Sequence, residues 1–236
     1  IWLLPTKGGK PTQLTSSPHA DFDARWSPDG KKIAFISTRN GTPQIFVISA
    51  AGGEAKQISH ISTGASGIVW SPDGKYIAFV SEVYPDLKTD AENYQREKQK
   101  KKSLVKAKVI DRLFYRYWNY WTNEKRSHVF VINSNGGEAR DVTPGYYDSP
   151  PLDLGSSHDY CFSPDSKEIA FVRNEDAVVA ISTNNDIFIT SVNGNNIKKI
   201  THSQAILSLI SSKIRCLCGA FASTLLPLTF QNLRRT

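Results

Sequence analysis

Short apolar segments recur along the chain, and turn-forming residues such as Gly, Pro, Asp and Asn lie between many of them. The clearest is KKIAFIS, in which Ile33, Phe35 and Ser37 lie on one side of an extended chain while Ala34 and Ile36 lie on the other. A strand that is apolar on both sides is expected to be buried between two neighbouring layers. The pattern therefore predicts an all-β protein built from buried strands.

The same strand follows the same turn three times. WSPDGKKIAFIS begins at Trp26, WSPDGKYIAFVS at Trp70 and FSPDSKEIAFVR at Phe162. In the turn, proline presets φ, aspartate can bond to its own backbone, and glycine takes a conformation that a side chain resists. We assign a structural role in these turns to Pro28, Asp29, Gly30, Pro72, Asp73, Gly74, Pro164 and Asp165. Ser166 replaces the glycine of the third copy, which costs about 0.5 to 1 kcal/mol if the position needs a positive φ.

A second unit, consisting of a strand, a Gly-rich turn and a short strand, begins at Ile1, Ile45, Val129 and Ile187. The spacing from Trp26 to Trp70 is 44 residues, which is typical of a β-propeller blade. We therefore predict a partial propeller of about three and a half blades, each a four-stranded antiparallel sheet. The expected domain is 1–202, with blade units at about 1–15, 16–59, 60–143 and 144–202.

One blade carries an insertion, residues 83–127. Its first part, Pro85 to Lys108, is rich in Glu, Gln, Lys and Ala and predicts a solvated helix. The following part, Asp111 to Ile132, predicts a hairpin of two aromatic-rich strands around a Thr-Asn-Glu-Lys turn.

The net charge of +7 comes from two segments. Residues 83–127 hold 12 Lys/Arg and 6 Asp/Glu, and residues 203–236 hold 4 Lys/Arg and no acid, so the rest carries 7 − 6 − 4 = −3. Arginines 112, 116 and 126 beside the aromatic residues of the insertion suggest stacking on single-stranded nucleic acid. The acidic body favours the other interpretation, in which the rings pack and the lysines keep the helix soluble. We expect no nucleic-acid partner.

The repeat pattern ends near Thr201, and residues 203–236 form a divergent tail that we expect to be disordered or non-native. An altered reading frame or an unspliced segment would explain it; the alternative is an amphipathic segment that covers the edge of the last blade. Cys161, Cys216 and Cys218 are too few for a disulfide framework and lack zinc-ligand spacing, so we predict neither a metal site nor a cofactor. No apolar run reaches the ~20 residues of a membrane span.

At these residues the chain resembles a known family. The repeated string WSPDGKxIAFxS, together with IFVI and GGE, resembles the TolB-like, WD40-like propeller repeat. Together with DRLFYRYWNYWTNEKRSHVFVINSNGGEARDVTPGYYDSPP, it is similar to the N-terminal propeller of the prolyl oligopeptidase family of serine peptidases, specifically its acylaminoacyl-peptidase and dipeptidyl-peptidase-like members. The resemblance covers about residues 1–202. It implies a propeller that caps a C-terminal α/β-hydrolase domain, which carries a serine nucleophile in a GxSxG motif, an aspartate and a histidine.

No catalytic residue is assigned in this chain. None of its fifteen glycines frames a serine in a GxSxG motif, and we expect histidines 19, 60, 128, 158 and 202 to lie in propeller loops. The resemblance thus predicts a non-catalytic module that gates and selects short peptides and is inactive alone. Tyr146, Tyr147 and Asp148 are candidates for contact with substrate or with the hydrolase domain; the alternative is that they form only a connector between blades. The alternative function is a TolB-like scaffold that binds proteins.

The chain begins at Ile1 and contains no methionine, which favours a mature product or a fragment and leaves the compartment open between cytoplasm and periplasm or exterior. An arc of blades has two unpaired strand edges and an uncovered apolar face. We therefore predict a soluble protein that is marginally stable alone or self-associates through these edges.

Overall fold

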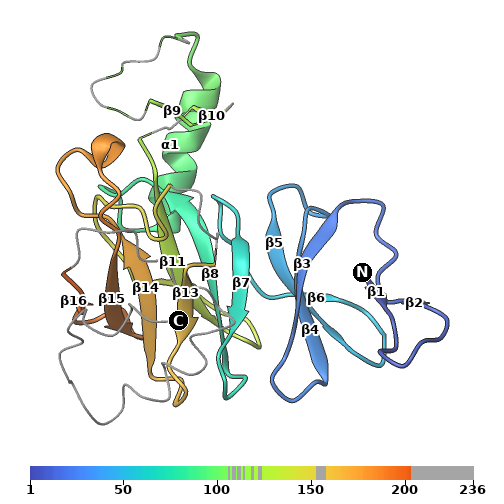
Figure 1. Ribbon diagram of the computed structural model, residues 1–236. Helices are drawn as coiled ribbons and strands as arrows, with labels where there is room; N and C mark the ends of the chain where they lie inside the picture. The colour runs from blue at the N-terminus through green and yellow to red at the C-terminus, as the bar shows by residue number, and fades with distance from the viewer. Residues whose placement is uncertain are drawn as a thin grey trace.

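Three four-stranded antiparallel sheets and one two-stranded half-sheet lie side by side in chain order (Figure 1). The computed structural model describes residues 1–105, 107, 110, 113, 115–117, 120, 121, 124–152 and 158–202. The predicted tail, Cys216, Cys218 and Arg112 lie outside the described residues. The four-stranded antiparallel architecture confirms the predicted partial propeller.

The half-blade and blade 1 contain the first six strands: β1 (Trp2–Leu3), β2 (Thr12–Gln13), β3 (Asp21–Trp26), β4 (Lys32–Ser37), β5 (Gln44–Ser49) and β6 (Lys56–Gln57). Blade 2 contains four strands: β7 (Ser66–Trp70), β8 (Tyr76–Val83), β11 (Arg126–Asn133) and β12 (Arg140–Asp141). Blade 3 contains four strands and a short 3-10 helix, η1 (Val179–Ile181): β13 (Tyr160–Phe162), β14 (Glu168–Arg173), β15 (Asp186–Ser191) and β16 (Lys198–Lys199).

The two faces of each central strand belong to different hydrophobic cores, as the two-sided apolar pattern predicts. In β4, Ile33 and Phe35 face the half-blade, while Ala34 and Ile36 pack against blade 2. The opposite face of blade 2 packs against blade 3 through Val80 and its neighbours. Blade 2 thus supplies one face to each of two cores, which holds the three sheets together.

Equivalent residues of the three blades make equivalent contacts. A phenylalanine pair is stacked across the two central strands of each blade, with ring centroids 5.6 to 5.9 Å apart: Phe35 with Phe46, Phe79 with Phe130, and Phe171 with Phe188. A hydroxyl 14 residues downstream accepts a hydrogen bond from a backbone nitrogen in each repeat: Ile1 to Thr15, Ile45 to Ser59, Val129 to Thr143, and Ile187 to Thr201. The repeated unit is therefore a unit of packing as well as of sequence.

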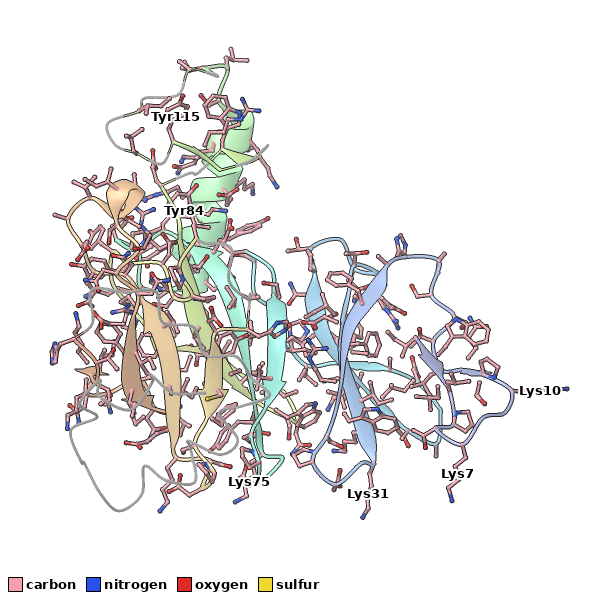
Figure 2. The ribbon with its side chains drawn as sticks, in the orientation of Figure 1. Lys7, Lys10, Lys31, Lys75, Tyr84 and Tyr115 are labelled. Carbon is pink, nitrogen blue, oxygen red and sulfur yellow. The ribbon has the colours of Figure 1, made fainter. Side chains whose placement is uncertain are left out.

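The Ser-Pro-Asp-Gly turns share one hydrogen-bond pattern. In the first, the Ser27 hydroxyl donates to Asp29 Oδ1 at 2.6 Å and accepts from the Lys32 N–H at 2.9 Å. The hydroxyls of Ser71 and Ser163 make the same two kinds of contact in the other copies. Lys31 and Lys75, which follow the first two turns, lie at the same end of their sheets (Figure 2).

The position that is glycine in the first two turns has a positive φ in all three. Gly30, Gly74 and Ser166 have φ values of 69°, 71° and 62°, so the condition for strain at Ser166 is met. The Ser166 hydroxyl also accepts a hydrogen bond from the Asp73 N–H of blade 2 at 3.1 Å. Backbone strain at Ser166 therefore destabilises the fold, and the inter-blade hydrogen bond offsets part of this cost.

A matched pair of substitutions tests this balance. Gly30→Ser is expected to lower the free energy of unfolding by about 1 kcal/mol, because it adds strain without an inter-blade bond. Ser166→Gly is expected to change it by less than about 0.5 kcal/mol, because the relieved strain offsets the lost bond. Urea unfolding of both variants measures the two values; equal and large losses in both would contradict this explanation.

The insertion contains one helix, α1 (Asp90–Lys102), which projects beyond the end of blade 2 (Figure 1). A capping box starts it: the Thr89 hydroxyl accepts from the Glu92 N–H, and the Glu92 carboxylate accepts from the Thr89 N–H. The predicted helix is confirmed but is shorter than Pro85 to Lys108. The described part of the chain contains no helix long and apolar enough to cross a membrane.

The predicted hairpin of Asp111 to Ile132 is wrong in its pairing. A short hairpin, β9 (Arg116–Tyr117) with β10 (Tyr120–Trp121), forms on its own, and β11 pairs instead with β8. The register between β8 and β11 extends over eight residue pairs. Because both faces of β11 are apolar, it is stabilised inside the blade stack and not in an exposed hairpin.

Candidate functional site

The tyrosine loop, residues 145–149, connects blade 2 to blade 3 and contains all three candidate contact residues. Blade 2 holds it through two groups on β11. The Arg126 Nε donates to the Tyr146 carbonyl at 3.0 Å, and the Ser127 N–H donates to Asp148 Oδ1 at 2.8 Å. The Asp148 carboxylate is therefore engaged within the protein, so its predicted contact with a substrate is not favoured by this geometry.

His128 holds the loop from the same strand. Its side chain is buried, its Nδ1 lies 2.6 Å from Asp141 Oδ2, and its Nε2 lies 2.9 Å from the Gly145 carbonyl oxygen. The expectation that this histidine lies in a loop is wrong, because it belongs to β11. Its Nε2 faces a backbone carbonyl where a catalytic triad would have a serine hydroxyl.

Blade 3 holds the other side of the loop through Arg173. Its Nε donates to the Ser149 hydroxyl at 2.9 Å, and one terminal nitrogen donates to the Thr143 carbonyl at 2.8 Å. The guanidinium also lies over the Tyr147 ring, 5.7 Å from the centroid. The loop is thus fixed by both blades, and the interpretation as an inter-blade connector accounts for all of these bonds.

Two rings of the loop remain available to solvent. Tyr146 is 62% exposed and Tyr147 is 37% exposed. Adjacent tyrosines on a fixed backbone offer a large contact area with a hydroxyl at each tip, which suits recognition of a peptide or a protein. Among the described residues, no group of three or more His, Cys, Asp or Glu side chains could hold a metal ion.

Asp148 is the half-buried acid of this site, with 22% of its side chain exposed. Burial raises the pKa of its carboxyl, against the opposing effects of the Ser127 N–H and the Arg126 guanidinium. Since the folded protein binds this proton more tightly than the unfolded chain, Asp148 stabilises the fold less as the pH rises through its folded pKa. Asp148→Asn keeps the acceptor oxygen for Ser127 but removes the desolvated charge.

We therefore expect Asp148→Asn to be more stable than the parent chain at pH 7. The stability difference should shrink as the pH falls toward 4, where the parent aspartate takes up its proton. Urea unfolding of both proteins across this range measures the difference. A stability difference that stays constant with pH would mean that the charge of Asp148 is not its cause.

A second polar cluster joins the first strands of the three blades, β3, β7 and β13. Asp23 lies in a bulge of β3 with φ 52°; its carboxylate accepts from the Ile68 N–H at 3.0 Å and lies 2.7 Å from the Arg25 guanidinium. Burial acts to raise the pKa of Asp23, but the bonds from His158 and Ile68 outweigh it and the pKa is lowered. The Tyr160 hydroxyl donates to the Gly67 carbonyl in the same region.

The sequence pattern alone does not point to this cluster or to Arg173. A position-by-position comparison of the repeats contains the signal, because Arg173 stands where the other two copies have Ser37 and Ser81. In the same alignment, Asp23 and Asp159 stand where the second copy has Gly67. Substitutions at positions otherwise shared between repeats mark the places where one blade has a separate role.

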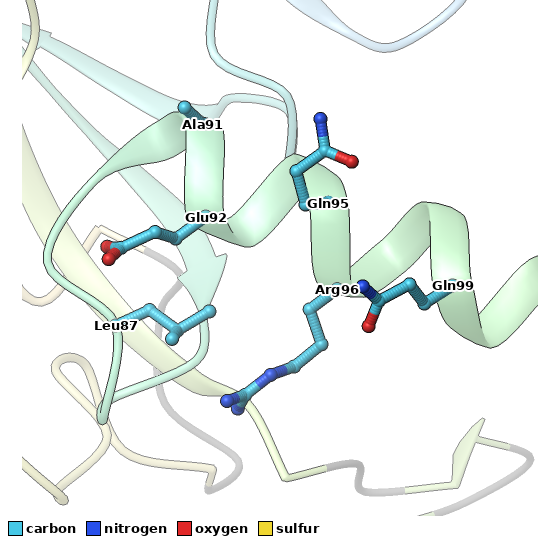
Figure 3. A pocket seen from close by; sticks show the side chains of 6 residues that line it. All are labelled: Leu87, Ala91, Glu92, Gln95, Arg96 and Gln99. Carbon is cyan, nitrogen blue, oxygen red and sulfur yellow. The ribbon is translucent and has the colours of Figure 1, made fainter.

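The insertion is anchored to blade 2 around Tyr84 (Figure 2). The buried Tyr84 donates its hydroxyl to Glu97 at 2.7 Å, and Arg96 forms a bidentate pair with Asp86 at 2.7 and 2.8 Å. A shallow groove beside α1 is lined by six residues (Figure 3): Leu87, Ala91, Glu92, Gln95, Arg96 and Gln99. Its only cation is paired, and the groove is open, so we assign it no ligand.

The arginines suggested for nucleic-acid stacking have other contacts. Arg126 donates to the tyrosine loop, and the Arg116 guanidinium lies 6.0 Å from the centroid of the Trp121 ring. Two lysines of the insertion are paired with acids, Lys100 with Glu124 at 3.0 Å and Lys125 with Glu97 at 2.8 Å. These contacts disfavour stacking on nucleic acid, because the charged groups already have partners within the protein.

Comparisons with known proteins find sequence relatives of this chain. Residues 1–104 match the family described as the Tricorn protease N-terminal beta propeller domain. Over 190 residues, the chain is 31% identical to the uncharacterized peptidase YuxL of Bacillus subtilis. This match covers 80% of the present chain and 27% of YuxL. The chain is a propeller segment similar in sequence to part of known peptidases. The propeller segment is also 30% identical over 204 residues to dipeptidyl-peptidase 5 of Porphyromonas gingivalis, and covers 28% of it.

Solved structures agree on the fold of the propeller segment. Acylaminoacyl peptidase of Pyrococcus horikoshii superposes with a TM-score of 0.56 at 16% identity, over 86% of this chain and 27% of that one. TolB of Acinetobacter baumannii superposes with a TM-score of 0.51 at 19% identity, over 84% of this chain and 36% of that one. The propeller segment spans about a quarter of the length of the curated peptidases that it matches.

Proposed function

We propose that the propeller segment is the non-catalytic, substrate-selecting part of a serine peptidase and that the tyrosine loop contacts short peptides or the catalytic α/β-hydrolase domain. The observation that carries this proposal is the 30 to 31% identity to two peptidases over 80% of the chain. The exposed rings of Tyr146 and Tyr147, held on a backbone fixed by two blades, support the assignment of the contact.

Peptide binding tests the contact. Fluorescence anisotropy of labelled short peptides is expected to detect binding to the chain, and replacing both Tyr146 and Tyr147 by alanine is expected to weaken it about tenfold. Tyr94→Ala is the matched control, because Tyr94 is a similarly exposed tyrosine on α1, away from the loop. An affinity that is the same in the double variant and the parent would contradict the role of the loop.

Activity assays test the division between selection and catalysis. The chain is expected neither to cleave aminoacyl and dipeptidyl chromogenic substrates nor to react with a serine-directed fluorophosphonate. Turnover or labelling would overturn the proposal that this segment is non-catalytic. Pull-down of an α/β-hydrolase would support the peptidase role, whereas pull-down of an envelope or scaffold protein alone would favour the TolB-like alternative.

A further inference from the structure

His128 faces an acceptor at each ring nitrogen. The Asp141 carboxylate lies 2.6 Å from Nδ1, and the Gly145 carbonyl lies 2.9 Å from Nε2. A neutral imidazole carries one N–H and can donate only one of these bonds, leaving two lone pairs opposed at the other nitrogen. The side chain is buried, so water cannot relieve that repulsion. A second proton on the imidazole would let it donate to both acceptors.

We propose that His128 is held as an imidazolium with both ring nitrogens protonated, and that the tyrosine loop is fully bound to blade 2 only in that state. His128 is thus a positioning residue whose proton sets the conformation of the loop. This inference goes beyond the proposed function, because it holds whatever the loop contacts.

In blade 1, the equivalent residue holds the next connector without an extra proton. Gln44 occupies the position of His128, since the two residues pair with the equivalent Ser37 and Ser81 on the neighbouring strands. The Gln44 amide donates to the Ile61 carbonyl at 2.7 Å and accepts from the Ile61 N–H at 3.1 Å, and so holds the connector between blades 1 and 2. A neutral amide can serve both roles at any pH, whereas the imidazole of blade 2 cannot.

The charges around His128 determine which of its two bonds is the stronger. Acids from three elements lie in this region, Asp141 on β12, Asp148 in the loop and Glu82 on β8. Arg126 and Arg173 are the cations, and both already donate to the backbone of this connector. The short contact with Asp141 favours the proton at Nδ1, so an imidazole with a single proton keeps the bond to Asp141 and loses the bond to Gly145.

The first test needs no variant. Long-range ¹H–¹⁵N correlation spectra of the labelled chain are expected to show His128 with both nitrogens protonated at pH 7. The exposed His19, His60 and His202 provide internal references. A spectrum with one unprotonated His128 nitrogen at pH 7 would overturn the proposal.

The second test follows the loop. As the pH is raised above 7, amide exchange at residues 145–149, corrected for its intrinsic pH dependence, is expected to increase by about fivefold. The connector held by Gln44 should not change, and it serves as the matched control within the same molecule. Equal pH responses of the two connectors would contradict the proposal.

A double variant separates His128 from its neighbours. His128→Gln with Asp141→Gln gives blade 2 the residues that blade 1 has at positions 44 and 57, and is expected to abolish the pH response of the loop. Asp148→Asn should leave that response intact. If the response persists in the double variant, or disappears with Asp148→Asn, then Asp148 and not His128 controls the loop. The spectra of the parent chain decide the question even if the double variant does not fold.

Discussion

Phe79→Ala is expected to lower the free energy of unfolding by about 3 to 5 kcal/mol, the largest loss that we predict for a single residue. Phe79 is fully buried in the core between blades 1 and 2, and its ring stacks on Phe130 with centroids 5.6 Å apart. Its removal combines the loss of apolar burial with a cavity that neighbouring β strands cannot close.

Urea unfolding followed by tryptophan fluorescence measures this loss. Phe22→Ala is the control, because Phe22 is 43% exposed on β3, and its loss is expected to stay below about 1 kcal/mol. A cost below about 1 kcal/mol for Phe79→Ala would mean that the sheets do not share the core described above.

Arg173→Met is expected to cost about 3 kcal/mol and to loosen the tyrosine loop. The substitution retains much of the side-chain volume over Phe171 and Phe188 but leaves the Thr143 carbonyl and the Ser149 hydroxyl without their donor. Arg173→Lys keeps the charge and should recover less than half of the loss, because one ammonium group cannot reach both acceptors in the planar geometry of a guanidinium.

Arg39→Met is the matched control for Arg173. Arg39 also lies over a stacked phenylalanine pair, but it is partly exposed and its acid partner is Asp21. Its replacement should cost about 1 kcal/mol and leave the tyrosine loop unchanged. Unfolding measurements give both losses, and proteolysis near Tyr146 reports loosening of the loop. Equal losses at the two arginines would contradict a special role of Arg173.

Local pattern was sufficient to predict the repeated part of this fold. The Ser-Pro-Asp-Gly turn that ends at Gly30, and the following strand with apolar residues on both faces, depend on neighbours in sequence. Both are found as expected. The pairing of β11 with β8 depends on a partner that precedes it by an entire insertion, so the aromatic segment beside it suggested the wrong hairpin.

The candidate site was only partly predictable for the same reason. Tyr146 and Tyr147 are candidates because of the family resemblance and their position in a loop between blades, but the partners that fix the loop come from two different blades. Neither the contact between His128 and Gly145 nor that between Arg173 and Ser149 has a signature in adjacent residues. Only a register-by-register comparison of the blades reveals that these two positions differ from their counterparts.

Because blades 1 and 2 each contribute one face to each of two cores, the array behaves as a row of coupled neighbours in which these two interior members have two partners and the end members have one. In such a row, opening begins at the ends and proceeds inward. Slowly exchanging amides should therefore concentrate on β4, β5, β8 and β11, while β1, β2 and β16 exchange first. The tyrosine loop is bonded to β11 of blade 2, so one of its attachments lies in the part of the molecule that opens last.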